Sequence, residues 1–339
     1  MKKTEGKILL AHGSGGILMH DIIGSIFLKH FGNKTLNEQG DSAILSPGSS
    51  DLAFTTDSFV VDPLFFPGGD IGKLAVCGTV NDLAVSGAEP LYISASFIIE
   101  EGFAVKDLEM IAVSMADEAK KAGVLIVTGD TKVVNRGKCD RLFINTSGIG
   151  KIGKENLHIN KAINVMPGDL IIINGMIGDH GMAVMNARES FNFRAALESD
   201  CASLNHIIVE VLKKTRVRFM RDPTRGGVAA VLNELAVKTG LGIEIDESAL
   251  PVRKSVKAMC EILGLDPLHV ANEGKVIIVA QEGSMEEIMK VLKNNKLGKE
   301  SAVIGRVVDD HKGKVVLKNQ TGGRQFIGSL SGDQLPRIC

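Results

Sequence analysis

Five aspartates stand in settings that favour metal or phosphate chemistry. Each lies at the end of a strand-like run, within an apolar helix-like run or in a glycine-rich turn: Asp41, Asp57, Asp82, Asp130 and Asp222. A lone aspartate in such a turn usually only caps it. Mg²⁺, however, is commonly held by a few carboxylates together with phosphate oxygens and water. Several aspartates in similar settings therefore favour a metal–nucleotide site.

Two lysines, Lys73 and Lys132, are available to neutralise phosphate charge at such a site. The common nucleotide signatures are missing, because no Gly-Lys pair is followed by Ser or Thr, as a Walker loop requires. The glycines at 148, 150 and 153 match the spelling of a dinucleotide fingerprint, but no amphipathic helix follows them, and we regard the match as chance. A phosphate site in this chain must be built in another way.

One apolar helix is expected to position part of this site. A strand-like run over 52–56 ends at Asp57, and 71–86 has the composition of a buried helix that Asp70 can cap at its start. A carboxylate on such a helix, Asp82, is costly to bury unless a cation neutralises it. Asp82 therefore either holds a metal ion or lies on the one solvated side of the helix, and the segment alone leaves both open.

The rest of the first half predicts strands combined with two long helices, typical of an α+β domain. The stretch 124–128 reads as a short strand that delivers Gly129-Asp130-Thr131-Lys132 into a turn. A glycine-rich loop at 11–16 is either a flexible connection or a phosphate-approaching loop, and we favour the connection. The expected helices span 18–31 and 105–122, and further strands are expected at 40–44, 91–100 and 142–149.

Polar and turn-forming residues between 150 and 168 mark a domain boundary. We expect an α+β fold divided into a first domain (1–155), a second α/β domain (156–326) and a mobile tail (327–339). The tail is expected to be mobile because glycine, serine and proline prevent a stable helix there. The second domain is expected to contain strands at 170–174, 242–245, 276–279 and 302–308, helices near 201–213, 228–239 and 285–294, a loop at 178–181 and a hairpin over 307–317.

Composition excludes several classes of protein. The 339 residues carry a net charge of −1 without blocks of either sign, which argues against a nucleic-acid or membrane-surface partner. No apolar run is long enough to span a membrane and no secretory apolar core follows the first residues, so we expect a cytoplasmic protein. The five cysteines lack metal-ligand spacing, and Cys339 differs from the others in being the last residue.

Motifs along nearly the whole chain resemble one family. The sequence is similar to the HypE carbamoyl dehydratases of hydrogenase maturation, within the superfamily of aminoimidazole-ribonucleotide synthetase and selenophosphate synthetase. The TGDTKVV and PRIC segments distinguish this family within the superfamily. The matching segments are AHGSGG (11–16), GDSA (40–43), TTDSFVV (55–61), GTVNDLAVSGAEP (78–90), TGDTKVV (128–134), DPTRGG (222–227), NEG (272–274) and PRIC (336–339).

The resemblance implies ATP and Mg²⁺ bound between the two domains of a homodimer whose first-domain strands pair into a shared barrel. The implied metal ligands are Asp41, Asp82 and Asp222. The implied nucleotide-binding residues are Asp57, Lys73, Asn81, Asp82, Gly129, Asp130, Thr131 and Lys132. The implied catalytic residues are Cys339 as carrier, Glu273 as base and Lys132 at the γ-phosphate.

The chemistry that the resemblance implies explains a cysteine at the end of a mobile tail. A carbamoyltransferase, HypF, places a carbamoyl group on the Cys339 thiol, and ATP-dependent dehydration converts it to a thiocyanate. The cyanide then passes to a HypC–HypD complex for the iron centre of [NiFe]-hydrogenase. A mobile tail has the reach to visit donor, ATP site and acceptor in turn.

Three alternatives share the carboxylate pattern. A selenophosphate synthetase normally has a reactive cysteine and lysine in its N-terminal glycine-rich segment, where this chain has His12 and Ser14. A thiamine-phosphate kinase would not need the PRIC terminus. A non-catalytic nucleotide-binding scaffold could present the tail to partners, although the intact set of aspartates argues against it.

Overall fold

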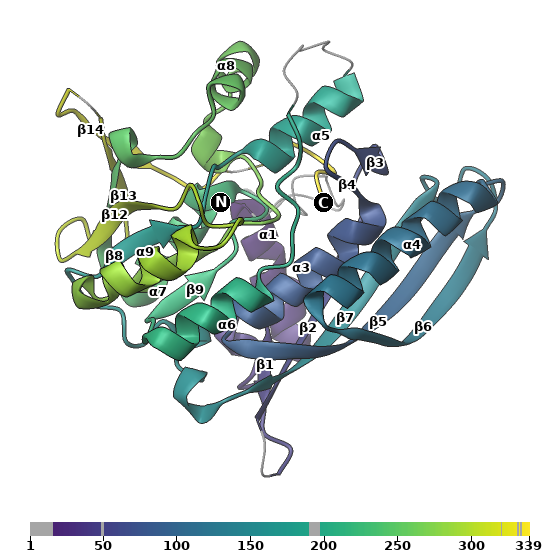
Figure 1. Ribbon diagram of the computed structural model, residues 1–339, viewed down its shortest axis with the longest axis horizontal. Helices are drawn as coiled ribbons and strands as arrows, with labels where there is room; N and C mark the ends of the chain where they lie inside the picture. The colour runs from purple at the N-terminus through teal and green to yellow at the C-terminus, as the bar shows by residue number, and fades with distance from the viewer. Residues whose placement is uncertain (1–15, 49–50, 190–196, 320, 331, 333) are drawn as a thin grey trace.

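The computed structural model describes residues 16–48, 51–189, 197–319, 321–330, 332 and 334–339, and it consists of two layered units (Figure 1). Each unit is built on one sheet, five-stranded in the first and seven-stranded in the second. The two-domain α+β fold expected from the sequence is confirmed. Among the described residues, no helix has the length and apolar character needed to cross a membrane.

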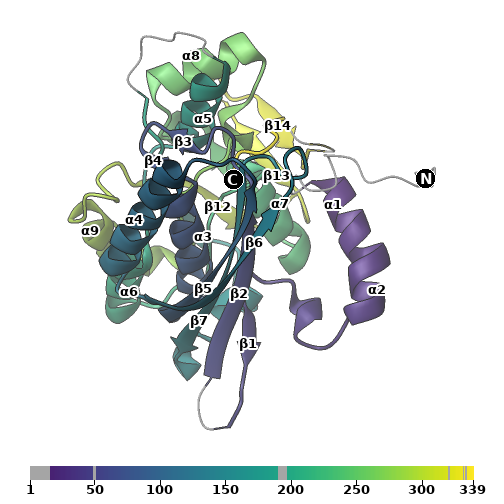
Figure 2. The same cartoon turned by 90° about the vertical axis from the view of Figure 1, so that its right-hand side faces the viewer.

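The first sheet is antiparallel except at one edge, where β6 runs parallel to β5. Helices α3 (Ile71–Val85) and α4 (Val105–Ala122) cover one of its faces (Figure 2). In sheet order the strands are β1 (Ala43–Leu45), β2 (Asp51–Phe59), β7 (Leu142–Ile152), β5 (Ala88–Glu100) and β6 (Leu125–Val134). A two-stranded ribbon, β3 (Phe65–Phe66) and β4 (Gly69–Asp70), precedes α3.

Both helices of the first unit form where the sequence predicted them. The Asp70 carboxylate accepts the backbone N–H groups of Gly72 and Lys73, so it caps α3. Helix α4 ends at Gly123, whose φ of 76° lies in the left-handed region that glycine tolerates. Gly72 lets the two helices approach closely, because a Cβ there would lie 2.5 Å from the carbonyl oxygen of Ile111.

The opposite face of the first sheet exposes apolar side chains, with Phe54, Tyr92, Ile98 and Ile149 all more than a third exposed. Between them lies a hydrogen-bonded polar group that includes Thr56, Asn145 and Ser147. Edge strand β6 is exposed along nearly its whole length. The prediction of a turn at 129–132 is wrong, because these residues lie in the middle of β6. They pair with β5 as far as Val134, and this pairing extends the strand beyond the apolar run visible in the sequence.

The second sheet is packed on both faces. The residues of β8 alternate between them: Ile171 and Ile173 face the layer of α7, while Ile172 faces α6 and α9. In sheet order its strands are β14 (Arg324–Ile327), β13 (Val315–Lys318), β10 (Gly242–Asp246), β12 (Ala302–Val308), β8 (Leu170–Ile173), β11 (Ile277–Ala280) and β9 (Phe219–Arg221). The helices are α5 (Asp179–Glu189), α6 (Asn205–Lys214), α7 (Gly227–Thr239), α8 (Lys254–Leu263) and α9 (Met285–Lys293).

Two predictions for the second unit are wrong. The stretch 307–317 is not a hairpin, because β10 lies between β12 and β13 and pairs with both. The loop expected at 178–181 is the start of α5. Gly181 allows that helix to pack closely, since a Cβ there would lie 2.5 Å from the Val270 side chain. Helix α8 was not predicted, although Val256, Met259 and Cys260 form its buried stripe.

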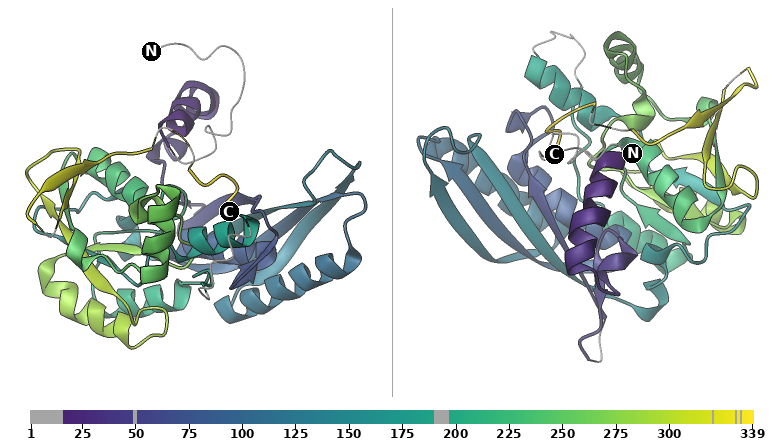
Figure 3. Two further views of the ribbon diagram at one scale, coloured as in Figure 1. Left: turned by 90° about the horizontal axis from the view of Figure 1, so that it is seen from above. Right: turned by 180° about the vertical axis from the view of Figure 1, so that it is seen from behind.

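The first helical segment stands beside the second unit (Figure 3). The helix predicted over 18–31 is present as α1 (Ile17–Ile22), a π-helical segment (Ile23–Phe27) and α2 (Leu28–Phe31). The glycine-rich loop at 11–16 lies outside the described residues except for Gly16.

The C-terminal segment has a docked position between the two units (Figure 1). The Val60 N–H donates to the terminal carboxylate of Cys339 at 3.1 Å, and the Asp62 N–H donates to the Arg337 carbonyl at 3.2 Å. Leu335 and Ile338 are buried. The tail was expected to be mobile, and the structure gives the position in which it is held.

Candidate functional site

A cavity of about 460 Å³ lies between the two units, and carboxylates from several elements line it. Asp57 comes from β2 and Asp82 from α3, while Asp41 precedes β1 and Asp222 follows β9. Glu273, from the loop before β11, completes the set. The structure thus brings together four of the five aspartates singled out in the sequence, together with the glutamate that the resemblance implied.

Asp82 faces this cavity from the otherwise apolar helix α3. The Thr55 hydroxyl on β2 lies within hydrogen-bond distance of the Asp82 carboxylate, at 2.7 Å, and of the Asp41 carbonyl, at 3.0 Å, and its single proton can serve either acceptor. Thr55 therefore ties the helix, the strand and the loop before β1 together. The side of α3 that carries Asp82 is the side that forms the site.

The carboxylates raise one another's pKa. Burial, more than any other cause, raises the pKa of Asp57 to about 6 against the opposing charge of Arg225. Burial and then repulsion from Asp41 and Asp57 raise the pKa of Asp222 to about 8. Burial and its carboxylate neighbours hold the pKa of Asp82 well above its ordinary value. A cavity of this kind favours a bound cation.

Part of the required positive charge comes from the protein. The Arg221 guanidinium binds the Asp41 carboxylate and also donates to Glu234 at 2.7 Å. In the part of the chain that the structure describes, no three His, Cys, Asp or Glu side chains are close enough to hold a metal ion by themselves. An all-oxygen set of a few carboxylates fits Mg²⁺, which takes its remaining ligands from phosphate and water.

Glu273 is a buried residue that lines the cavity. Its Oε1 atom has no hydrogen-bond partner among the described residues. Burial first, and then the charges of Asp222 and Asp200, raise its pKa well above the ordinary value. The backbone N–H groups of Glu273 and Gly274 donate to Asp200, so the main chain that carries this carboxyl is fixed. A carboxyl with a raised pKa can exchange protons near neutral pH.

Cys339 lines the same cavity as these carboxylates. Arg225 also lines the cavity. The negative charge at Cys339 is the largest cause of the raised pKa of Arg225, so the two residues interact electrostatically. Arg225 was not among the site residues predicted from the sequence. Its position in the DPTRGG segment, three residues after Asp222, was the available signal.

Other predicted site residues do not line this cavity. The Asn81 amide donates to the carbonyls of Ala202 and Glu273 and accepts the Leu204 N–H at 2.8 Å, so it joins the two units. The Lys73 ammonium donates to the Gly68 carbonyl at 2.8 Å.

The remaining predicted residues, 129–132, lie on strand β6. There the Lys132 ammonium pairs with Asp130 at 2.8 Å, and both side chains are more than half exposed. Within one chain, therefore, the structure does not bring this segment to the carboxylates.

Comparison with known proteins identifies the family. The models for AIR synthase related proteins match residues 39–152 (N-terminal domain) and 166–318 (C-terminal domain). The carbamoyl dehydratase HypE of Rhodobacter capsulatus is 47% identical over the whole of both chains. The chain belongs to the HypE family of carbamoyl dehydratases.

Solved HypE structures share this architecture. HypE in a HypE–HypF complex matches with a TM-score of 0.86 at 48% identity, covering 91% of this chain and 99% of that one. HypE in complex with ATP matches with a TM-score of 0.82 at 45% identity, covering 98% of this chain and all of that one. The family predicted from the sequence motifs is confirmed, whereas the roles of individual site residues stay predictions.

Proposed function

We propose that this chain dehydrates a carbamoyl group carried on the sulfur of Cys339 to a thiocyanate, at the expense of ATP, and so supplies cyanide for the iron centre of [NiFe]-hydrogenase. The observation that carries the proposal is that Cys339 lines the same cavity as the buried carboxylates. ATP can act on a group carried by Cys339 only if the cysteine reaches the site that binds the phosphates. Its position in this cavity meets that requirement.

The reaction balances with ATP as the only co-substrate. The carbamoyl oxygen attacks the γ-phosphorus and ADP leaves, while one N–H proton is lost as the carbon–nitrogen double bond forms. The second N–H proton leaves as the carbon–oxygen bond breaks. The products are thiocyanate on Cys339, ADP, phosphate and a proton.

The cavity residues have separate roles in this reaction. Asp41, Asp82 and Asp222 would hold Mg²⁺, with Asp57 beside them, and the metal would neutralise charge on the phosphate oxygens. Glu273 accepts an N–H proton, because its raised pKa suits a base near neutral pH. Asn81 positions Glu273 by donating to its backbone carbonyl.

The nucleotide-binding role of residues 129–132, and the catalytic role of Lys132, require a second copy of the chain. These residues lie on exposed strand β6, next to a sheet face on which several apolar side chains, such as Tyr92 and Ile98, are exposed among the described residues. Exposed edges and apolar faces of this kind are typical of strand pairing and association. A homodimer formed through this face would offer Lys132 of one copy to the cavity of the other.

The proposal also assigns partners. HypF is the carbamoyl donor, in line with the solved HypE–HypF complex. A HypC–HypD complex is the acceptor of the cyanide.

The direct test compares the wild-type protein with Cys339→Ser after incubation with HypF, carbamoyl phosphate and Mg-ATP. Mass spectrometry of the C-terminal peptide should find a carbamoyl adduct that then loses one water in the wild type, and neither species in the variant. Cys139→Ser is the matched control, because it removes another partly exposed thiol and should leave the reaction intact. A cyano adduct on the Cys339→Ser protein, or a wild-type adduct that never loses water, would overturn the proposal.

A further inference from the structure

The main chain of the last four residues is bound at three carbonyls and at the terminal carboxylate of Cys339. Each of these groups accepts at least one hydrogen bond from outside the tail, and two elements supply the donors. Helix α5 supplies them through its side chains, and the segment after β2 supplies them through its backbone. The pairs are Pro336 with Arg188, Arg337 with Arg188 and the Asp62 N–H, Ile338 with His180, and Cys339 with the Val60 N–H.

Arg188 joins three segments that are far apart in the sequence. Its guanidinium donates to the Pro336 and Arg337 carbonyls, each at 2.9 Å. The same group donates to the Asp62 carbonyl, from Nε at 2.9 Å and Nη2 at 2.7 Å. One side chain therefore holds the tail against the segment that follows β2 of the first unit. The planar guanidinium can serve several acceptors at once, which an ammonium cannot do with the same geometry.

His180 holds the next carbonyl from a buried position. Its Nε2 lies 2.8 Å from the Ile338 carbonyl oxygen and its Nδ1 lies 2.8 Å from the Ser199 hydroxyl. Because a carbonyl only accepts, Nε2 carries the proton and Nδ1 accepts the proton of Ser199. Burial lowers the pKa of His180, which keeps this neutral form at physiological pH.

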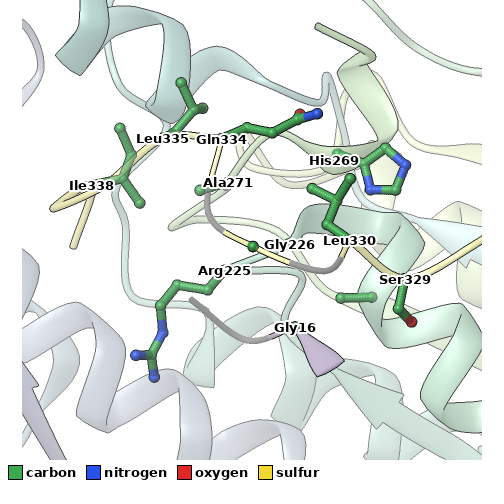
Figure 4. A pocket seen from close by; sticks show the side chains of 12 residues that line it. Gly16, Arg225, Gly226, His269, Ala271, Ser329, Leu330, Gln334, Leu335 and Ile338 are labelled. Atoms are coloured by element: carbon green, nitrogen blue, oxygen red, sulfur yellow. The ribbon is translucent and has the colours of Figure 1, made fainter. Parts of the chain in front are cut away.

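Apolar contacts complete the attachment. Leu335 and Ile338 belong to the same buried cluster as Met182 of α5 and Val256 of α8. Both tail residues also line a small pocket with Ala271 of the second unit (Figure 4). Leu335 and Ile338 are thus held by packing, and the tail main chain is held by hydrogen bonds. The Arg337 side chain adds a hydrogen bond from its Nε to the Val60 carbonyl at 3.0 Å and an ion pair with Asp140.

We propose that His180 and Arg188 are positioning residues that form a latch, fixing how far the Cys339 sulfur reaches into the carboxylate cavity. Three consecutive carbonyls are held, so the latch sets the tail in one register. A shift of one residue would move the sulfur by about 3.5 Å. The inference rests on the proposed function only for the role of the sulfur; the latch itself is a property of the resting protein.

The test measures how fast iodoacetamide alkylates Cys339 in the folded protein without ATP or any partner. Arg188→Gln and His180→Leu should each increase the rate by about tenfold or more, because each removes buried hydrogen bonds that keep the tail docked. Arg188→Lys should restore part of the protection. Free N-acetylcysteine, alkylated in the same buffer, serves as the reference for reagent and pH, because Cys139 stands next to Asp140, which pairs with Arg337 of the tail.

The matched control is Arg253→Gln. Arg253 pairs with Asp179 at the start of α5 at 2.9 Å but does not contact the tail in any hydrogen bond of the described residues. This variant should leave the alkylation rate of Cys339 unchanged. An equal increase in the control would mean that loosening α5 alone exposes the sulfur, and it would overturn the specific role of the latch.

A second experiment uses a variant with one glycine inserted between Ile338 and Cys339 and measures the rate of dehydration. The insertion leaves the latch partners in place. The carbamoylated insertion variant should dehydrate at least tenfold more slowly than the wild type.

Alkylation of Arg188→Gln at the wild-type rate, in protein with unchanged circular dichroism, would refute the latch even if the wild type makes thiocyanate. Protection of Cys339 without thiocyanate formation would refute the proposed reaction and leave the latch standing.

Discussion

Asp222 is an aspartate whose proton is held more tightly in the folded chain than in the unfolded chain. Its folded pKa is raised to about 8 by burial and by neighbouring carboxylates. A raised carboxyl pKa contributes stability that is fully present below the unfolded value near 4. That stability is lost as the pH rises through the folded value. The metal-free protein should therefore lose stability between about pH 4 and pH 8.

Replacing Asp222 by asparagine removes this dependence. In EDTA, Asp222→Asn should be more stable than the wild type at pH 8, by on the order of 1 to 3 kcal/mol, and the gain should shrink towards pH 4. Urea unfolding of both proteins at several pH values measures this difference in the free energy of unfolding. Asp309→Asn, at an exposed position, should follow the wild type. A constant difference between Asp222→Asn and wild type at all pH values would contradict the titration of this carboxyl.

At the level of residues, the sequence predicts the acidic part of the site and misses the basic part. Asp41 and Asp222 are recognisable because each stands where a strand meets a turn. Asp57 is recognisable because it follows an apolar strand-like run, although β2 continues past it to Phe59. Arg221 and Arg225 flank Asp222, but nothing in their spacing says that both point into the cavity that holds the carboxylates. That information comes only from the packing of the two units against each other.

Among the elements, β6 offers the clearest test of assembly. Its Val133 is 66% exposed on a strand that forms an edge of the sheet. Val133→Glu places a charge in any interface formed there, so it should shift the protein from dimer to monomer. Light scattering after gel filtration measures the mass.

A matched control for this element is Val237→Glu on α7, where the side chain is 72% exposed. It should leave the mass unchanged. A wild type that is already monomeric, or a Val133→Glu protein that remains dimeric, would count against pairing through β6.

Elements set by local sequence are predicted well, and those set by distant contacts are not. Helix α4 has a clear apolar stripe and a glycine at its end, so its bounds agree with the prediction. Strand β6 runs past its apolar start because it pairs with β5. Helix α5 begins at Asp179 among glycines that locally disfavour a helix.

At the scale of the whole molecule, Asn81 is a joint between the two units. Asn81→Ala would leave the Leu204 N–H and the carbonyls of Ala202 and Glu273 without this partner. Each unpaired buried group costs about 1 to 3 kcal/mol, so the free energy of unfolding should fall by at least that amount. Urea denaturation measures the loss.

Asn233→Ala is the matched control for Asn81→Ala. The Asn233 amide donates within its own helix, to the Ala229 carbonyl at 2.8 Å, and its loss should cost much less. Equal losses from the two substitutions would mean that the joint adds nothing beyond an ordinary side-chain hydrogen bond.

The latch residues His180 and Arg188 bind only backbone carbonyl oxygens of the tail, so the latch does not sense what the Cys339 sulfur carries. The tail should be held almost equally whether Cys339 carries a free thiol, the carbamoyl group or the cyano group. The latch therefore cannot distinguish product from substrate. Departure of the tail must then be driven from elsewhere, by a change of nucleotide state or by an acceptor that competes for the same backbone.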